Sequence, residues 1–133
     1  MAMKKKFPRE EYRKLHYLRK AYQRVVRARV LLEEGKLVAS REVLAGVATM
    51  LKACYETGIL TEDEYEDTRK RLSSVLSLYD WVIKVSYGEG ERILISNPNA
   101  YVELVEKVRY FEDFLMRLYT DKVHFYSTQR TLM

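Results

Sequence analysis

Six side chains near the N-terminus carry positive charge, or can acquire it, and repeat at helical spacing. They are Arg9, Arg13, His16, Lys20, Arg24 and Arg27, separated by 4, 3, 4, 4 and 3 residues. At about 100° per residue these positions fall on one narrow face of a helix, roughly opposite Leu15, Leu18 and Val25. Residues 1–36 contain twelve Lys and Arg against four Glu, a net charge of +8, whereas the rest of the chain carries a net −3. Such a concentrated positive surface attracts polyanions.

Three interpretations of this basic row are open. A row of charges on a helix is most often a solvated face, and Glu33 and Glu34 show that the same segment also carries acids. Nucleic acid is the second candidate ligand, with Tyr12 and Tyr17 beside the row as residues that could stack on bases. An acidic protein or a membrane surface is the third. The row is not accompanied by a zinc-ligand set, a glycine-rich loop or a recognition-helix pair.

The usual catalytic and metal-binding patterns are absent from the sequence. Neither His16 nor His124 follows a Glu at the spacing that a metal site in a helical bundle needs. Asp121 stands three residues before His124, and we interpret these two as a satisfied or solvent-facing pair. Cys54 falls on an apolar stripe, which favours an inert, small hydrophobic residue over a nucleophile. We therefore predict no catalytic residue, no cofactor and no metal.

Two Arg–His pairs, Arg117-x6-His124 and Arg9-x6-His16, resemble the motif of HEPN-type ribonucleases. These enzymes are small helical bundles, common in archaea, in which an Arg is followed a few residues later by a His. The chain departs from that pattern because Leu118 stands where a polar residue is usual, and because the other pair lies in the first predicted helix. The resemblance implies RNA cleavage, with Arg117 and His124 as the pair to test.

The segment after Pro98 is more apolar than one buried stripe requires. Beside its core positions lie further apolar side chains, from which we select a candidate interface for a protein partner or a second copy. Its residues are Val102, Tyr110, Phe114, Met116 and Tyr119. Either this segment is enclosed on all sides or a second face packs on a partner. Exposed aromatic residues with Met are typical of protein-binding surfaces.

Apolar residues repeat every three to four positions in four segments, which predicts four helices. Gly35 and Gly58 stand where helices can end in the left-handed conformation. Thr61 and Glu64 have the spacing of a capping box at the start of the third helix. Asn97-Pro98 has the residues of a helix start, with Asn as N-cap and Pro in the first turn.

Four apolar stripes are sheltered from water only by packing together, so Leu18, Leu51, Val75 and Leu115 should share one interior. Short links make neighbouring helices antiparallel. We predict an all-α fold, an antiparallel four-helix bundle with up-down-up-down order. The bundle should span residues 8–126, between a flexible basic N-terminus at 1–7 and a C-terminal tail at 127–133. The link 87–97 should be a loop over one end of the bundle.

Residues 51–76 resemble a SHOCT-type helical hairpin. The resemblance lies in the corner Gly58-Ile59-Leu60-Thr61, which precedes an acidic helix start containing Tyr65. Members of that family are short interaction or oligomerisation elements. The same corner also arises from helix-capping physics alone, so an ordinary hairpin turn is the alternative interpretation.

Composition places the chain in a reducing, aqueous compartment. A single cysteine excludes an internal disulfide framework, and no apolar stretch is long enough for a signal peptide or a membrane span. We therefore expect an intracellular, cytoplasmic protein that does not insert into membranes. Only four Asn and Gln accompany 24 Lys and Arg and 19 Asp and Glu, which resembles the composition of hyperthermophile proteins. This composition resembles that of a small protein from a hyperthermophilic archaeon, or from its virus or plasmid.

These observations favour a non-enzymatic interaction protein that binds a protein partner or itself, with a basic face on its first helix. The alternative is a nucleic-acid-binding protein that uses the basic row. A HEPN-like ribonuclease is the third candidate.

Overall fold

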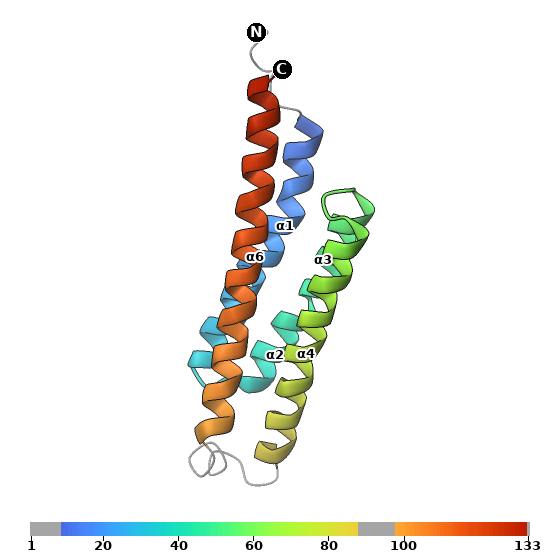
Figure 1. The fold of residues 1–133 in the computed structure, drawn as a ribbon. Coiled ribbons are helices and arrows are strands. Elements are labelled where there is room, and N and C mark those ends of the chain that lie inside the picture. Colours follow the sequence, from blue (N-terminus) through green and yellow to red (C-terminus); the bar gives the residue numbers. More distant parts are fainter. Residues whose placement is uncertain (1–8, 88–97, 133) are drawn as a thin grey trace.

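The computed structural model describes residues 9–87 and 98–132, with side chains described for 13–85 and 99–127. Its elements are α1 (Arg9–Glu33), α2 (Leu37–Ala45), α3 (Val47–Glu56), α4 (Glu62–Tyr87) and α6 (Pro98–Leu132) (Figure 1). No strand occurs in these ranges, so the prediction of an all-α fold is confirmed.

Two of the predicted helix ends have the local geometry that their residues indicated. Gly35 and Gly58 have φ angles of +82° and +83°, the left-handed region that only glycine adopts without cost. After each glycine the backbone amide reaches back five residues, from Lys36 to Leu31 and from Ile59 to Cys54. Both ends are therefore Schellman motifs, in which the last carbonyls of the helix accept hydrogen bonds.

The predicted capping box at the start of α4 is also present. The Glu64 amide donates to Thr61 Oγ1 over 3.1 Å, and the Thr61 amide donates to Glu64 Oε1 over 2.9 Å. Lys122 of α6 donates to the same carboxylate oxygen of Glu64 over 2.7 Å. The Glu64 carboxylate therefore completes the N-terminal cap of α4 and also binds Lys122 of α6.

The second predicted helix is not continuous, because Gly46 separates α2 from α3. The guanidinium group of Arg24 lies over this break, and its Nε donates to the carbonyl of Val43 over 2.8 Å. Carbonyls in the last turn of a helix lack partners in their own helix, so a donor from α1 can satisfy one of them. A Cβ at Gly46 would lie 2.5 Å from Arg24 Nε, so glycine leaves the space that the guanidinium group occupies.

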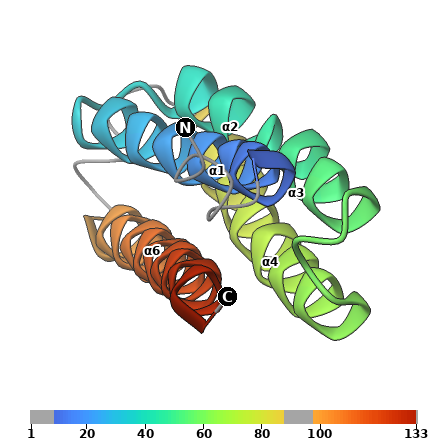
Figure 2. The ribbon, with the colours of Figure 1, turned by 90° about the horizontal axis from the view of Figure 1, so that it is seen from above.

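The helices pack in two layers (Figure 2). One layer contains α1, α2 and α3, and the other contains α4 and α6. α1 contacts α6, α2 and α3, whereas α4 contacts α3, α6 and α2. α1 and α6 lie side by side and extend at one end beyond the hairpin of α3 and α4 (Figure 1).

The predicted interior is confirmed. Leu18, Leu51, Val75 and Leu115 are all buried and belong to one hydrophobic cluster. Most of the other predicted stripe positions are buried with them, and the remainder pack half-buried against that cluster. The sequence patterns did not single out the buried small residues of α1, Ala21 and Ala28. Small residues let helices approach closely. Alanine is only weakly hydrophobic, so it contributes little to a periodic pattern of apolar residues.

The ends of the chain agree with the sequence only in part. α6 continues to Leu132, so the helix includes most of the segment predicted as a tail at 127–133. The predicted flexible N-terminus at 1–7 lies outside the described residues, as does nearly all of the predicted loop at 87–97. Among the described helices, none is both long and apolar enough to cross a membrane.

Candidate interaction surfaces

The surface of α6 that points away from the other helices presents one large aromatic ring among charges. We call this surface the outer face of α6. Its residues are Glu103, Glu106, Lys107, Tyr110, Asp113 and Arg117. The side chain of Tyr110 is 78% exposed, more than any other large hydrophobic residue among the described side chains. Within the described residues, none of the five charged side chains of this face makes an ion pair.

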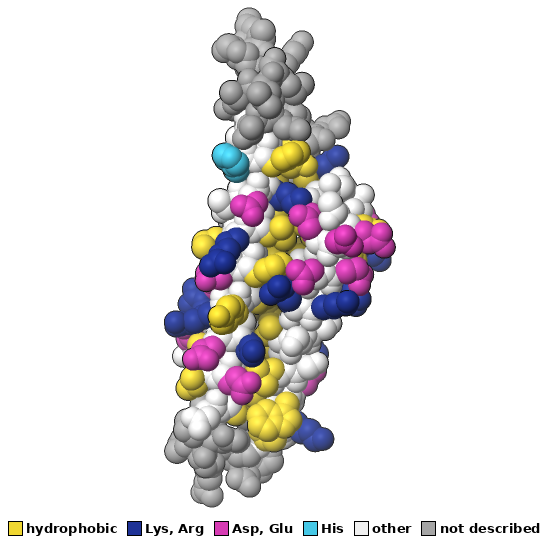
Figure 3. All heavy atoms as spheres, in the orientation of Figure 1, with side chains coloured by type: hydrophobic (Ala, Val, Ile, Leu, Met, Phe, Trp, Pro, Cys, Tyr) yellow, Lys and Arg dark blue, Asp and Glu magenta, His cyan; other side chains and the backbone are white. Residues whose placement is uncertain are grey.

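A hollow of 390 Å³ lies beside Tyr110, between α4 and α6, and we call it the α4–α6 hollow. It is lined by Arg71, Ser74, Val75, Lys107, Tyr110 and Phe111. An adjoining hollow shares Ser74, Val75 and Lys107 and continues to Trp81, which is 49% exposed. In Figure 3 yellow hydrophobic side chains run along the middle of the molecule, between dark blue and magenta charged ones. The two hollows thus form an open groove with apolar residues along its length.

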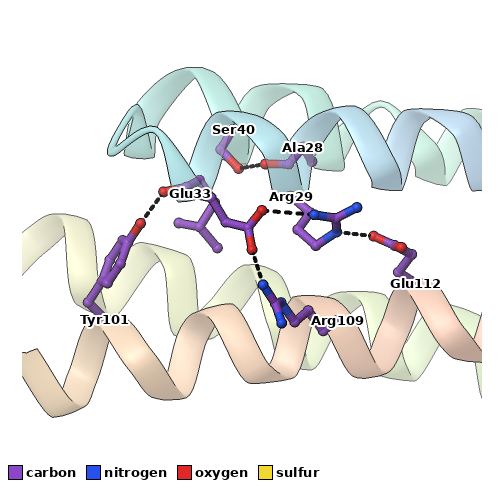
Figure 4. Close-up of polar contacts among 8 residues, drawn as sticks. Ala28, Arg29, Glu33, Ser40, Tyr101, Arg109 and Glu112 are labelled. Atoms are coloured by element: carbon purple, nitrogen blue, oxygen red, sulfur yellow. Dashed lines mark hydrogen bonds and ion pairs between the residues drawn. The ribbon is translucent and has the colours of Figure 1, made fainter.

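On its side toward α1, next to the buried core positions, α6 is bound to that helix by polar contacts (Figure 4). Arg29 of α1 donates to Glu112 over 2.5 Å and to Glu33 over 2.8 Å, and Arg109 of α6 donates to the other oxygen of Glu33. The hydrogen bond from Arg109 lowers the pKa of the Glu33 carboxyl, and the bond to Glu112 raises the pKa of Arg29. Tyr101 also donates to the carbonyl of Leu32. These contacts engage the charged groups on that side of α6. A hollow of 690 Å³ also lies there, and it is lined by Arg29, Glu106, Arg109, Tyr110, Glu112 and Asp113.

The five residues of the predicted interface do not lie together. Val102, Tyr110 and Met116 are exposed, whereas Phe114 and Tyr119 are half-buried against the core. Tyr110 and Met116 are about 120° apart around the helix axis, so they face different directions. The ring of Phe114 instead lies under Arg71 of α4, with 4.2 Å between the guanidinium carbon and the ring centre.

Two residues of the groove, Arg71 and Trp81, were not singled out from the sequence. Trp81 is the chain's only tryptophan and stands next to Val82, a buried stripe position of α4. A large aromatic residue beside a helical stripe was the signal that could have found it.

The basic row divides into exposed and engaged members. Arg13, His16, Lys20 and Arg27 are exposed. Arg24 is half-buried and bonded to the break between α2 and α3, so it is less open than the other members, and its part in polyanion binding stays a prediction. The side chain of Arg9 lies outside the described residues.

The exposed members of the row are regularly spaced. Arg13, Lys20 and Arg27 are seven residues apart, about 10 Å along the helix. None of them forms an ion pair within the described part of the chain. The Nδ1 atom of His16 accepts a hydrogen bond of 3.0 Å from Arg19.

The remaining candidate groups lie apart from any enclosed site. Cys54 is buried, and this burial raises the pKa of its thiol to about 12, so it is an inert core residue. Asp121, His124 and Arg117 are exposed on α6, with the Arg and the His about 10 Å apart along the helix. Within the described residues no three His, Cys, Asp or Glu side chains gather as metal ligands would.

Comparison with known proteins adds no family. A scan against protein-family models found no match, and searches of curated proteins and of solved structures found no similar protein. The features that can carry a function are therefore the groove, the outer face of α6 and the basic row.

Proposed function

We propose that this chain is a non-enzymatic, intracellular interaction protein that binds a protein partner or a second copy of itself. The binding surface is the outer face of α6 together with the groove between α4 and α6. The single observation that supports this is the position of Tyr110, 78% exposed at the edge of a hollow whose lining includes Val75 and Phe111. Tyr, Trp and Arg are the residue types that contribute most at protein interfaces, and Tyr110, Trp81 and Arg71 all lie here.

This surface also has a rigid support. The ion pairs of α6 with α1 and the bond between Lys122 and Glu64 fix the helix on both sides. A preformed surface loses little conformational entropy on binding, which leaves more of the contact energy for affinity.

A photo-crosslinker at Tyr110 tests the proposal. Benzoylphenylalanine in place of Tyr110 should give one main adduct in the cells that naturally contain the protein, with either a second copy or one other protein. The same probe in place of Lys52, which is exposed on α3, is the matched control. With the purified partner, Trp81 emission should shift to shorter wavelength, and Tyr110→Ser should weaken binding at least about 10-fold. Adducts that are absent, or identical to those of the control, would contradict the proposal.

For the fold, we propose the antiparallel up-down-up-down arrangement. It is supported by the order of helix contacts, in which α1 contacts both α2 and α6 and α4 contacts both α3 and α6. The short connections at Gly35 and Gly58 support it too, because each turns the chain within a few residues. Spin labels at Lys20 and Lys52 should be close together, since antiparallel packing brings these two positions to a similar height. A distance near the full length of α1 would contradict this arrangement.

Nucleic-acid binding is the second candidate function, and the regular spacing of Arg13, Lys20 and Arg27 supports it. Three cations that make no ion pair among the described side chains lie in line along one exposed ridge, and they suit a phosphate backbone because each can displace a counterion.

Arg13→Glu combined with Arg27→Glu should weaken the affinity for single-stranded RNA or DNA at least about 10-fold, measured by fluorescence polarisation from 25 to 200 mM salt. The slope of log affinity against log salt should become shallower by about 1.5. Lys52→Glu with Lys70→Glu makes the same change in net charge elsewhere and is the control. Equal losses in both double variants, or no binding at low salt, would exclude this function.

The ribonuclease interpretation requires that the chain cleave RNA and that His124 and Arg117 be needed for cleavage. RNA cleavage by the purified chain that is lost on His124→Ala or Arg117→Ala would contradict the non-enzymatic proposal.

A further inference from the structure

Four of the five charges on the outer face of α6 are arranged symmetrically about Tyr110. Glu103 stands seven residues before Tyr110 and Arg117 seven residues after it, with opposite charge. Lys107 stands three residues before it and Asp113 three residues after it, again with opposite charge. These four charges are complementary to their own reverse, because each meets its opposite when a second copy lies antiparallel, while Glu106 lies opposite Phe114.

We infer that the outer face of α6 binds the same face of a second copy in an antiparallel, two-fold symmetric dimer centred on Tyr110. This inference rests on the proposed function and names the partner of that surface. In this register Glu103 lies opposite Arg117 of the second copy, and Lys107 lies opposite Asp113 of the second copy. Two-fold symmetry repeats each pair, so the interface contains four opposite-charge pairs around one central pair of rings.

The shape of the surface fits the same symmetry. A two-fold interface requires that one patch contain both a projection and the space to receive it. Tyr110 is the projection, and the α4–α6 hollow beside it is the space, with Val75 and Phe111 in its lining. The ring of each Tyr110 can therefore enter the hollow of the other copy. There the ring would be buried against apolar side chains and would contact the cations of the lining, Arg71 and Lys107.

The charges also select the register. Sliding one copy by four residues in one direction would place Glu103 opposite Asp113 of the other copy, and sliding it in the other direction would place Lys107 opposite Arg117. A parallel pairing would place every charge opposite its own kind. Like charges at such distances repel, so the antiparallel register centred on Tyr110 is favoured.

In the described residues, no ion pair engages these groups, although Glu103 and Lys107, like Asp113 and Arg117, are opposite charges four residues apart on the same helix. The charges of this face make no ion pair in the described residues, whereas Arg109 and Glu112, which face α1, are both engaged. Arg109 and Glu112 thus form ion pairs within the chain, whereas the charged side chains of the outer face are accessible to an external partner.

Sedimentation equilibrium of the full chain tests the dimer. The apparent mass should rise from 15.8 kDa toward twice that value as the concentration increases from about 1 µM to about 1 mM, a range set by the small size of a one-helix interface. Tyr110→Ser should weaken association at least about 10-fold. Lys52→Glu, a charge change on the exposed part of α3, should leave it unchanged.

Charge exchange gives the decisive comparison. Glu103→Arg and Arg117→Glu each place like charges opposite one another, and each should weaken self-association about 10-fold. An equimolar mixture of these two variants restores both pairs and should form a heterodimer as tight as the original homodimer. The double variant, Glu103→Arg with Arg117→Glu, should also recover. Unchanged circular dichroism shows that the exposed substitutions leave the fold intact.

The outcomes separate this inference from the proposed function. A strict monomer at 1 mM, or single variants that are not rescued by mixing, overturns the dimer. If the crosslinker at Tyr110 then captures one other protein whose purified form binds the same face, the proposed function stands without self-association. If it captures nothing specific, both are overturned.

Discussion

At the scale of single residues, the buried polar groups show how the interior fixes its contacts. Ser40 of α2 donates to the carbonyl of Ala28 in α1 over 2.5 Å, and its oxygen lies 2.6 Å from the hydroxyl of Tyr79 in α4. Since the Ser40 proton is used on Ala28, Tyr79 is the donor in the second bond. Three helices are joined by this chain of bonds, and Ser40 and Tyr79 are fully buried within it.

Ser40→Ala should therefore destabilise the protein more than Tyr79→Phe. Removing Ser40 Oγ leaves the buried Tyr79 hydroxyl without its partner and should cost about 2 kcal/mol, whereas Tyr79→Phe removes one bond and leaves no unpaired donor, for about 1 kcal/mol. Urea unfolding followed by circular dichroism measures both free energies. Ser73→Ala, at an exposed position of α4, is the control, and equal costs for the two buried changes would contradict the arrangement.

Alkaline pH should act through the same tyrosine. Burial raises the pKa of Tyr79 to about 12 from an ordinary value of 10.0. Because the folded chain holds the proton more tightly, the stabilisation is complete below pH 10 and is lost as the pH rises toward 12. Tyr79→Phe should lose less stability than the wild type between pH 9 and pH 11 in urea titrations. Parallel losses in the two proteins would show that Tyr79 does not contribute.

At the scale of elements, the helix ends and the helix break have different origins. The Schellman ends at Gly35 and Gly58 and the capping box at Thr61 follow from neighbouring residues. The break at Gly46 is instead covered by Arg24, which comes from another helix and donates to the carbonyl of Val43. Gly46 itself has the right-handed φ of −64°, so its backbone does not require glycine. What requires glycine there is the space filled by the guanidinium group.

A double-mutant cycle tests this explanation. Gly46→Ala alone should destabilise the protein by about 1 kcal/mol, because the displaced guanidinium group loses its bond to Val43, which outweighs the higher helix propensity of alanine. In the background of Arg24→Ala the same change should instead stabilise the protein by up to about 1 kcal/mol. The measurement is the unfolding free energy in urea. Additive effects would show that the two residues are independent.

At the scale of the whole molecule, ion pairs link α6 to both of its neighbours. Glu33 joins α1 to Arg109, and Glu64 joins α4 to Lys122. Burial opposes ionisation of Glu64, but hydrogen bonds from Lys122 and Thr61 outweigh it and lower its pKa. The bond from Arg109 lowers the pKa of Glu33. The longest helix, α6, is therefore held to its neighbours through the carboxylates of Glu33 and Glu64, and both ion pairs require an ionised carboxylate.

Acid should weaken these links together. A carboxyl with a lowered pKa in the folded chain stabilises that state fully above its unfolded value of about 4.5 and loses the contribution as the pH falls below it. The urea midpoint should therefore fall between pH 6 and pH 3, and Arg109→Met with Lys122→Met should reduce that fall. Arg69→Met, which removes a pair within α4, is the control. An unchanged pH dependence in the double variant would contradict this role.

The sequence by itself determined the four helical segments, the helix ends at Gly35, Gly58 and Thr61, and the residues of the interior. These features depend on residues close together along the chain, where apolar spacing and capping geometry operate directly. Tertiary structure decided the rest. Arg24 belongs to a basic row by spacing, yet it lies over Gly46 because packing brings α1 against α2 and α3. Likewise the hollow beside Tyr110 exists only where α4 and α6 meet, since residues far apart in sequence form its walls. Helical periodicity specifies which side of a helix is buried, but not which neighbour covers it.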